Sequence, residues 1–184
     1  MIDTIGLLEF KRISSGIEAS NQMIKAADVE LLSARYICPG KYIVLISGDL
    51  SAVKSSVKAG VEVAKKDLMK ELVIPKINKS LIDIIQGKNN EIGEIKALGI
   101  LEYSSIASGI IAADAAVKAS EIEFLKIVLG MRTAGKSLII FTGSIEACQQ
   151  GLNAAELANK DNEKYLLGKK LISSPEKKLV EKLI

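Results

Sequence analysis

The sequence of 184 residues contains no histidine and no tryptophan, and it has only two cysteines and three prolines. Without histidine the chain cannot supply a Ser-His-Asp or Cys-His catalytic centre, or a zinc site with histidine ligands. Two cysteines are too few for a disulfide-rich scaffold and are typical of a protein kept in a reducing cytoplasm. The composition therefore argues against these catalytic classes and against a secreted scaffold.

Long apolar runs and concentrated charge are also missing. No apolar run approaches the ~18 residues that span a bilayer. The N-terminal residues lack a basic region followed by an apolar one, so we expect neither a membrane segment nor a signal peptide. The net charge is only +3, from 25 basic and 22 acidic residues, and no basic run is interleaved with aromatic residues. Nucleic acid is therefore not expected as a partner.

The most informative feature that is present is an internal repeat. The repeated segments are Ile5–Phe10 with Leu98–Tyr103, Ile13–Ile17 with Ile106–Ile110, and Val29–Leu32 with Ile122–Leu125. Gly and Glu recur at the same places over this distance, which chance similarity does not explain. The chain is therefore a tandem duplication, and we place the first domain at residues 1–92 and the second at residues 93–184.

Each copy carries the same order of expected elements: strand, helix, two strands, helix, strand and a terminal helix. In the first copy the apolar spacing predicts strands over 5–10, 29–37, 41–47 and 71–74, and helices over 17–27, 51–66 and 79–86. In the second copy it predicts a helix over 145–158 and a strand over 165–171. This pattern predicts an α/β (α+β) fold in which each domain is an antiparallel sheet flanked by helices, a ferredoxin-like variant.

One cysteine lies in a short link between two expected strands. Pro39 lacks a backbone donor and Gly40 accepts a positive φ, so a tight loop is expected with Cys38 at its tip. Because a free cysteine is usually buried, a core thiol at a strand end is the structural alternative. The corresponding loop of the second copy, Gly130–Lys136, is two residues longer and has no cysteine.

The remaining candidates favour structural roles. Cys148 lies between Ala and Gln in an expected helix, where a packed thiol is more common than a ligand. Glu9 and Glu102 recur at strand ends, and a repeated polar contact is a simpler explanation than catalysis. Gly6 and Gly99 indicate close packing, because no phosphate-binding glycine pattern follows them.

These motifs resemble those of bacterial microcompartment shell proteins, in particular the tandem-domain trimeric type, such as the T-type of propanediol-utilisation compartments. Three segments carry the resemblance, which covers nearly the whole chain: Ile5–Glu9, Ala26–Leu31 and Ile37–Lys41. It implies a non-enzymatic homotrimer, a flat pseudo-hexameric tile with a pore on its axis. It also implies that the tile joins other shell proteins in the shell of a cytoplasmic microcompartment.

The resemblance further implies that the first-copy loop lines this pore. Cys38 from three chains is then expected to hold one 4Fe–4S cluster per trimer on the three-fold axis. Its role is electron transfer across the shell or cluster delivery, with an encapsulated redox enzyme as a further partner. The rest of the pore loop is Ile37, Pro39, Gly40 and Lys41.

Lys25 and Lys118 match the family's tile-edge lysine, which packs against its counterpart on the next tile; solvated helix charges are the alternative. The family's edge arginine between prolines is missing, so the edge contacts are expected to differ. Two other functions remain open. One is a metabolite-transport pore tile without a metal cluster, and the other is a free-standing signalling or ligand-binding protein of ferredoxin-like architecture.

Overall fold

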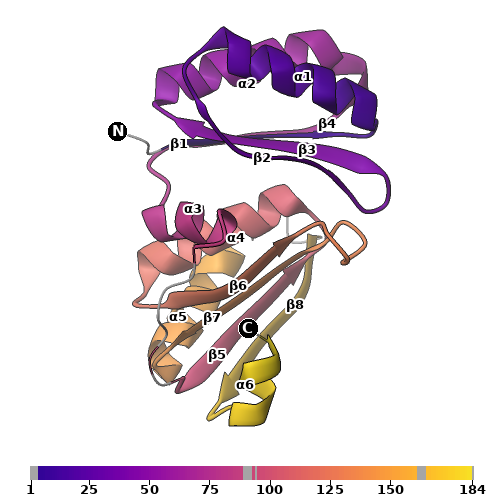
Figure 1. Cartoon of the computed structure of the whole chain (residues 1–184). Coiled ribbons are helices and arrows are strands. Elements are labelled where there is room, and N and C mark those ends of the chain that lie inside the picture. The colour runs from indigo at the N-terminus through magenta and orange to yellow at the C-terminus, as the bar shows by residue number, and fades with distance from the viewer. Residues whose placement is uncertain (1–3, 89–92, 94, 161–164, 184) are drawn as a thin grey trace. The chain divides into compact units, whose positions relative to one another are not determined.

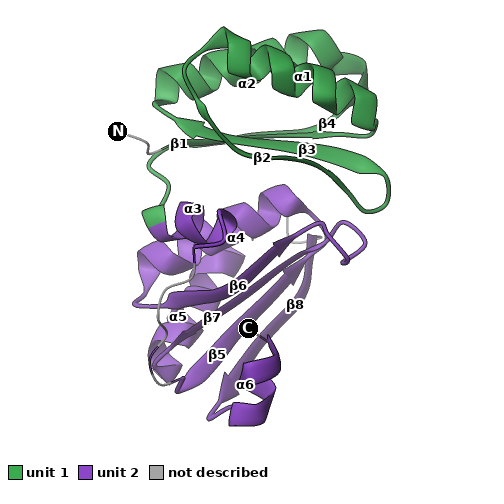
Figure 2. Cartoon of the chain, viewed as in Figure 1, with its two compact units in different colours: residues 1–79 green, residues 80–184 purple. Residues whose placement is uncertain are grey.

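The computed structural model describes residues 4–88, 93, 95–160 and 165–183. Contacts within the chain divide it into two compact units, residues 1–79 and 80–184 (Figure 2). The domain boundary expected after residue 92 lies at the edge of a segment outside the described residues. The two units match the two copies of the repeat except at helix 79–86, which was expected to close the first copy but belongs from residue 80 onward to the second unit.

The first unit is a four-stranded antiparallel sheet covered on one face by two helices (Figure 1). Its elements are β1 (Thr4–Phe10), α1 (Ile13–Ala26), β2 (Glu30–Ile37), β3 (Lys41–Gly48), α2 (Leu50–Ala64), a 3-10 turn (Lys65–Asp67) and β4 (Leu68–Ile74). The strand order is β2-β3-β1-β4. A βαββαβ chain with this strand order is the ferredoxin-like arrangement that the sequence predicted.

The second unit repeats this arrangement with the strand order β6-β7-β5-β8. Its elements are α3 (Lys79–Ile85), β5 (Ala97–Tyr103), α4 (Ile106–Ala119), β6 (Glu123–Leu129), β7 (Ser137–Gly143), α5 (Ile145–Ala158), β8 (Leu166–Ser173) and α6 (Lys177–Leu183). Tyr103 bonds to α5, whereas Leu98 packs with Val180 of α6, so α5 and α6 cover opposite faces of the sheet. None of the described helices is long and apolar enough to cross a membrane.

Side chains from one face of the first sheet interlock with α1 and α2 to form its core. The fully buried members include Leu8, Phe10, Val44 and Ile46 from the strands and Ala19, Met23 and Val53 from the helices. A Cβ at Gly6 would lie 2.8 Å from Val53, and one at Gly99 would lie 2.1 Å from Phe141. Both glycines therefore allow close packing, as the sequence predicted.

The largest differences from the predicted element boundaries are at the starts of α1 and β4, while other bounds shift by one or two residues. Helix α1 begins at Ile13 rather than Ile17. Its N-cap residue is Arg12, whose side chain makes no capping hydrogen bond. Strand β4 begins at Leu68 rather than Glu71, because a single 3-10 turn replaces the predicted last turn of α2 and brings Leu68 opposite Phe10. The connections after β1 and before β4 are thus shorter than the apolar pattern predicted.

Candidate functional site

Cys38, Pro39 and Gly40 form the turn that joins β2 to β3. Strand pairing ends with Ile37 opposite Lys41, and the Gly40 N–H donates to the Ile37 carbonyl at 2.9 Å. Gly40 has φ +83°, while a Cβ there would meet nothing within 4 Å, so backbone conformation rather than space favours glycine. The Cys38–Pro39 bond is cis. The predicted tight loop is confirmed.

The two cysteines occupy contrasting environments. Cys38 is half-buried in the hairpin turn, between the buried Ile37 and the exposed Pro39. Cys148 is fully buried in α5, and this burial raises the pKa of its thiol. The structure therefore places Cys38 outside the core, and it confirms Cys148 as a packed structural thiol. A thiol at a turn is the one of the two that can meet a ligand.

An ion pair holds the start of β3 against β1 beside this turn. Lys41 Nζ lies 2.9 Å from Glu9 Oε1, and the Glu9 side chain is only 6% exposed. The second copy repeats the pair, with Lys136 Nζ 2.8 Å from Glu102 Oε1. Both the Lys and the Glu recur in the sequence, and from this joint recurrence the pair could have been predicted, although only a repeated polar contact of the glutamates was expected. The side chain of Lys41 is therefore bound to β1, where the carboxylate of Glu9 offsets its charge.

The loop of the second copy is built differently. The Gly130 N–H donates to the Lys136 carbonyl at 2.9 Å, and the Thr133 hydroxyl donates to the same oxygen at 2.7 Å. Arg132 and Ala134 adopt positive φ values of 57° and 52°. This longer loop is stabilised by its own hydrogen bonds and offers no thiol.

The two predicted edge lysines lie at the C-terminal ends of equivalent helices. Lys25 is in the last turn of α1 and is exposed, and no ion pair joins it to another described residue. Lys118 is in the last turn of α4 and pairs with Asp114, one helical turn earlier. The position equivalent to Asp114 in α1 is Asn21, so the two lysines differ in their local partners.

Metal-binding capacity within one chain is limited. Across the described part of the chain, no three Cys, Asp or Glu side chains gather closely enough to hold a metal ion. Iron–sulfur clusters are held by several thiolates. A cluster at Cys38 therefore requires thiols from other chains.

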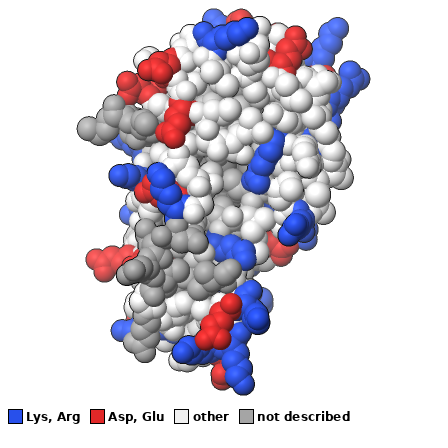
Figure 3. Space-filling model, in the orientation of Figure 1, with Lys and Arg blue, Asp and Glu red and all other residues white. Residues whose placement is uncertain are grey.

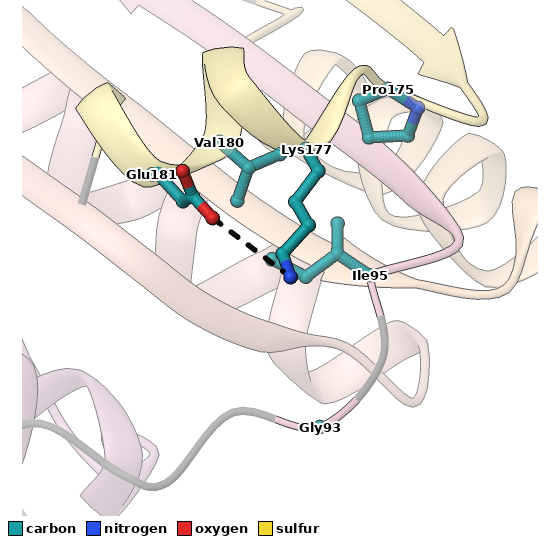
Figure 4. Close-up of a pocket in the computed structure, with 6 residues that line it drawn as sticks. All are labelled: Gly93, Ile95, Pro175, Lys177, Val180 and Glu181. Atoms are coloured by element: carbon teal, nitrogen blue, oxygen red, sulfur yellow. Dashed lines mark ion pairs between the residues drawn. The ribbon is translucent and has the colours of Figure 1, made fainter.

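The second unit has a hollow of about 420 Å³ beside α6 (Figure 4). Ile95, Pro175 and Val180 line it, together with the ion pair between Lys177 and Glu181, whose charged atoms are 4.0 Å apart. The described residues of this lining include no cysteine. This hollow therefore offers no chemistry comparable to that of the Cys38 turn.

A duplicated ferredoxin-like unit, with a diverged hairpin loop in each copy, defines a tandem-domain protein. The BMC domain model matches residues 4–77 and again residues 97–175. The chain thus belongs to the family of bacterial microcompartment shell proteins, in its tandem-domain form. Members of this family are structural proteins of the compartment shell rather than enzymes, and they assemble with other shell proteins as oligomeric tiles.

Similar proteins support this assignment. The chain is 35% identical over 155 residues to the bacterial microcompartment shell protein PduT of Citrobacter freundii, covering 84% of both chains. A crystal structure of a microcompartment protein from Desulfitobacterium hafniense superimposes with a TM-score of 0.92 at 39% identity, covering 98% of this chain and 99% of that one. The carboxysome shell protein CcmK2 of Synechocystis sp. is 37% identical over 62 residues, which are 34% of this chain and 60% of CcmK2.

Proposed function

We propose that three chains form a ring-shaped shell tile in which three Cys38 thiolates, one from each chain, hold a single 4Fe–4S cluster at the central pore. The observation that carries the proposal is the position of Cys38, which is half-buried in a hairpin turn while the other cysteine is in the core. Thiolates are the protein ligands of iron–sulfur clusters, so three Cys38 thiolates would bind three of the four irons, and the fourth iron would take water, a small thiol or a partner's side chain. The rest of the predicted pore loop is Ile37, Pro39, Gly40 and Lys41.

The trimer is supported by an apolar stripe on α1. Ile13, Ile17 and Ile24 lie on one face of this helix and are 39%, 55% and 46% exposed. Their equivalents Ile106 and Ile110 in α4 are each only 1% exposed. Exposed apolar stripes mark interaction surfaces, and a repeated unit buries such faces most simply against another copy of itself.

The residues of the turn prepare the thiol for this role. The hydrogen bond from Gly40 to Ile37 closes the turn, so the position of Cys38 is defined before chains meet. The same bond occupies the Gly40 N–H, which is therefore already paired within the turn. Because Glu9 offsets the charge of Lys41, the ammonium group is held by β1. When bound, the cluster would transfer single electrons across the shell or would itself be delivered to another protein. An encapsulated redox enzyme is the expected partner.

Anaerobic reconstitution tests the proposal. Wild-type protein treated with iron and sulfide should gain absorbance near ~400 nm and about four irons per three chains. Cys38→Ser should abolish both, while Cys148→Ser should retain both and serves as the matched control. Sedimentation should give about three times 19.7 kDa for all three proteins.

The alternative function is a metabolite pore without a metal. It replaces the iron–sulfur proposal if reconstituted wild type carries no iron, or if Cys38→Ser binds as much iron as wild type. A stable monomer at micromolar concentration would contradict both pore proposals, because neither has an axis without assembly.

A further inference from the structure

Four basic side chains gather at the end of the first sheet that also carries the Cys38 turn. They are Lys11, Arg12, Lys65 and Lys66, all exposed, and we call them the basic rim. Phe10 pairs with both Tyr42 and Leu68. The segment that follows β1 and the segment that precedes β4 therefore lie at the same end of the sheet as the start of β3. Figure 3 shows Lys and Arg side chains projecting from unit 1 at the upper right of the view.

A buried carboxylate organises half of the basic rim. Asp67 is 7% exposed and accepts a hydrogen bond from the Ser15 hydroxyl at 2.5 Å. Lys11 Nζ and Arg12 Nε lie 3.4 and 3.5 Å from its other oxygen. One carboxylate thus faces two cations, while no ion pair joins Lys65 or Lys66 to another described residue. The basic rim therefore keeps a surplus of positive charge.

The second copy provides an internal comparison. The residues equivalent to Lys11 and Arg12 are Ser104 and Ser105, and Ser105 Oγ accepts the Ser108 N–H as the cap of α4. Arg12 stands at the same cap position of α1 and accepts no such bond. A cation is unfavourable at the positive end of a helix, and an arginine there forgoes a stabilising cap. Helix stability therefore does not explain Arg12.

The basic rim borders a concave surface. Ser15 and residues 62–67 line a hollow of about 630 Å³ at this end of the unit. Glu62, its other acidic residue, lies 3.9 Å from Lys58 and is thus already offset. Gly16 lets α1 approach Tyr42, since a Cβ at Gly16 would lie 2.3 Å from that ring. The start of α1 is therefore packed next to the first residues of β3, beside the Cys38 turn.

We propose that the basic rim is a docking surface for a protein with an acidic surface, which binds transiently next to the Cys38 turn. The role of this docking surface rests on the proposed pore function, because a partner bound here lies next to the thiol that would hold the cluster. Charge complementarity steers such encounters and speeds association. A protein fits better than nucleic acid, because neither the basic rim nor the described lining of the hollow includes an aromatic side chain for base stacking.

A labelled octa-glutamate peptide is the probe, with octa-glutamine and a thymidine octanucleotide for comparison. Fluorescence anisotropy with the full chain at low salt should show binding of octa-glutamate, weakened at ~0.5 M salt because exposed charges are then screened. Lys11→Ser with Arg12→Ser, which installs the residues of the second copy, should weaken binding by about fivefold. Lys65→Ala with Lys66→Ala should do the same. Lys178→Ala with Lys182→Ala removes two exposed lysines of α6 and should change nothing.

Three outcomes would overturn the docking surface: no binding at low salt, an equal loss in the α6 control, or equally tight, rim-dependent binding of the oligonucleotide. All titrations are repeated with Cys38→Ser, whose binding should match wild type because docking requires no iron. Loss of iron binding with intact peptide binding would refute the pore proposal alone. Iron binding without peptide binding would refute the docking surface alone.

Discussion

Lys41 Nζ lies 2.9 Å from Glu9 Oε1, and this pair ties the first residue of β3 to β1 directly beside the Cys38 turn. The pair recurs between Lys136 and Glu102, but the burial differs. The Lys41 and Glu9 side chains are 28% and 6% exposed, whereas those of Lys136 and Glu102 are 43% and 39% exposed. In both copies the pairing with the fourth strand shifts register directly after the Glu.

This difference in burial predicts unequal costs of neutralising the two carboxylates. Glu9→Gln should lower the free energy of unfolding by about 1–3 kcal/mol, because Lys41 then loses a buried partner. Glu102→Gln, the matched control, should cost less than about 1 kcal/mol, because exposed pairs contribute little. Urea denaturation followed by circular dichroism measures both. Equal costs would mean that the buried pair contributes no more to the free energy of unfolding than the exposed pair.

The two thiols should differ in reactivity. Iodoacetamide at pH 8 should modify Cys38 in the folded protein and leave Cys148 untouched, because burial raises the pKa of Cys148 and blocks access to it. Mass spectrometry should find one modified cysteine per chain, and two after unfolding in urea. Modification of Cys148 in the folded protein would show that α5 opens more readily than its packing indicates.

The edge lysines predict a defect in tiling rather than in folding. Replacing Lys25 and Lys118 together with Asp should leave the tile oligomer intact and abolish extended sheets on overexpression, as seen by electron microscopy. Lys118→Asp should also cost about 0.5 kcal/mol of stability, because it sets two acids one turn apart with Asp114. Lys25→Asp sets the new acid one turn from Asn21, which carries no charge, and should lack this cost. Unchanged sheets would identify both lysines as solvated surface charges.

Asp67 should make the stability of the first unit depend on acid pH. The Ser15 hydroxyl, with Arg12 and Lys11, holds the pKa of Asp67 below its ordinary value. Its stabilisation is therefore present above the unfolded value of about 4 and is lost as the pH falls through the folded value. Asp67→Asn should lower the melting temperature at pH 7 and flatten its fall in acid. Parallel curves for both proteins would contradict this assignment.

Much of the fold followed from the sequence because the chain contains two copies of one pattern. Helix 145–158 was placed at its observed bounds, and the antiparallel ferredoxin-like sheets followed from the order of elements. The start of α1 was missed because Arg12, which is not a typical capping residue, stands at its N-cap. Capping preferences are statistical, and packing over Tyr42 outweighs them here.

The candidate site was predicted in part. The tight turn and the contrast between Cys38 and Cys148 followed from Pro39, Gly40 and the helical setting of Cys148. The pair between Lys41 and Glu9 was missed, because strand register determines which distant residues meet and apolar patterns do not fix register between separate strands. The same limit hid the basic rim, whose two halves, Lys11–Arg12 and Lys65–Lys66, are more than fifty residues apart in sequence and meet only through the pairing of β1 with β4.

The unequal loops of the two units also bear on how such a protein can change over time. In an oligomer of single-domain chains, a substitution in the gene alters every hairpin loop of the assembly at once. Here a substitution in the β2–β3 turn leaves the β6–β7 loop untouched, so a new chemical group arises in half of the loops while the other half keeps its own hydrogen-bonded form. Fusing two domains in one chain thus allows a reactive residue to be introduced into half of the hairpin loops while the other half stay unchanged.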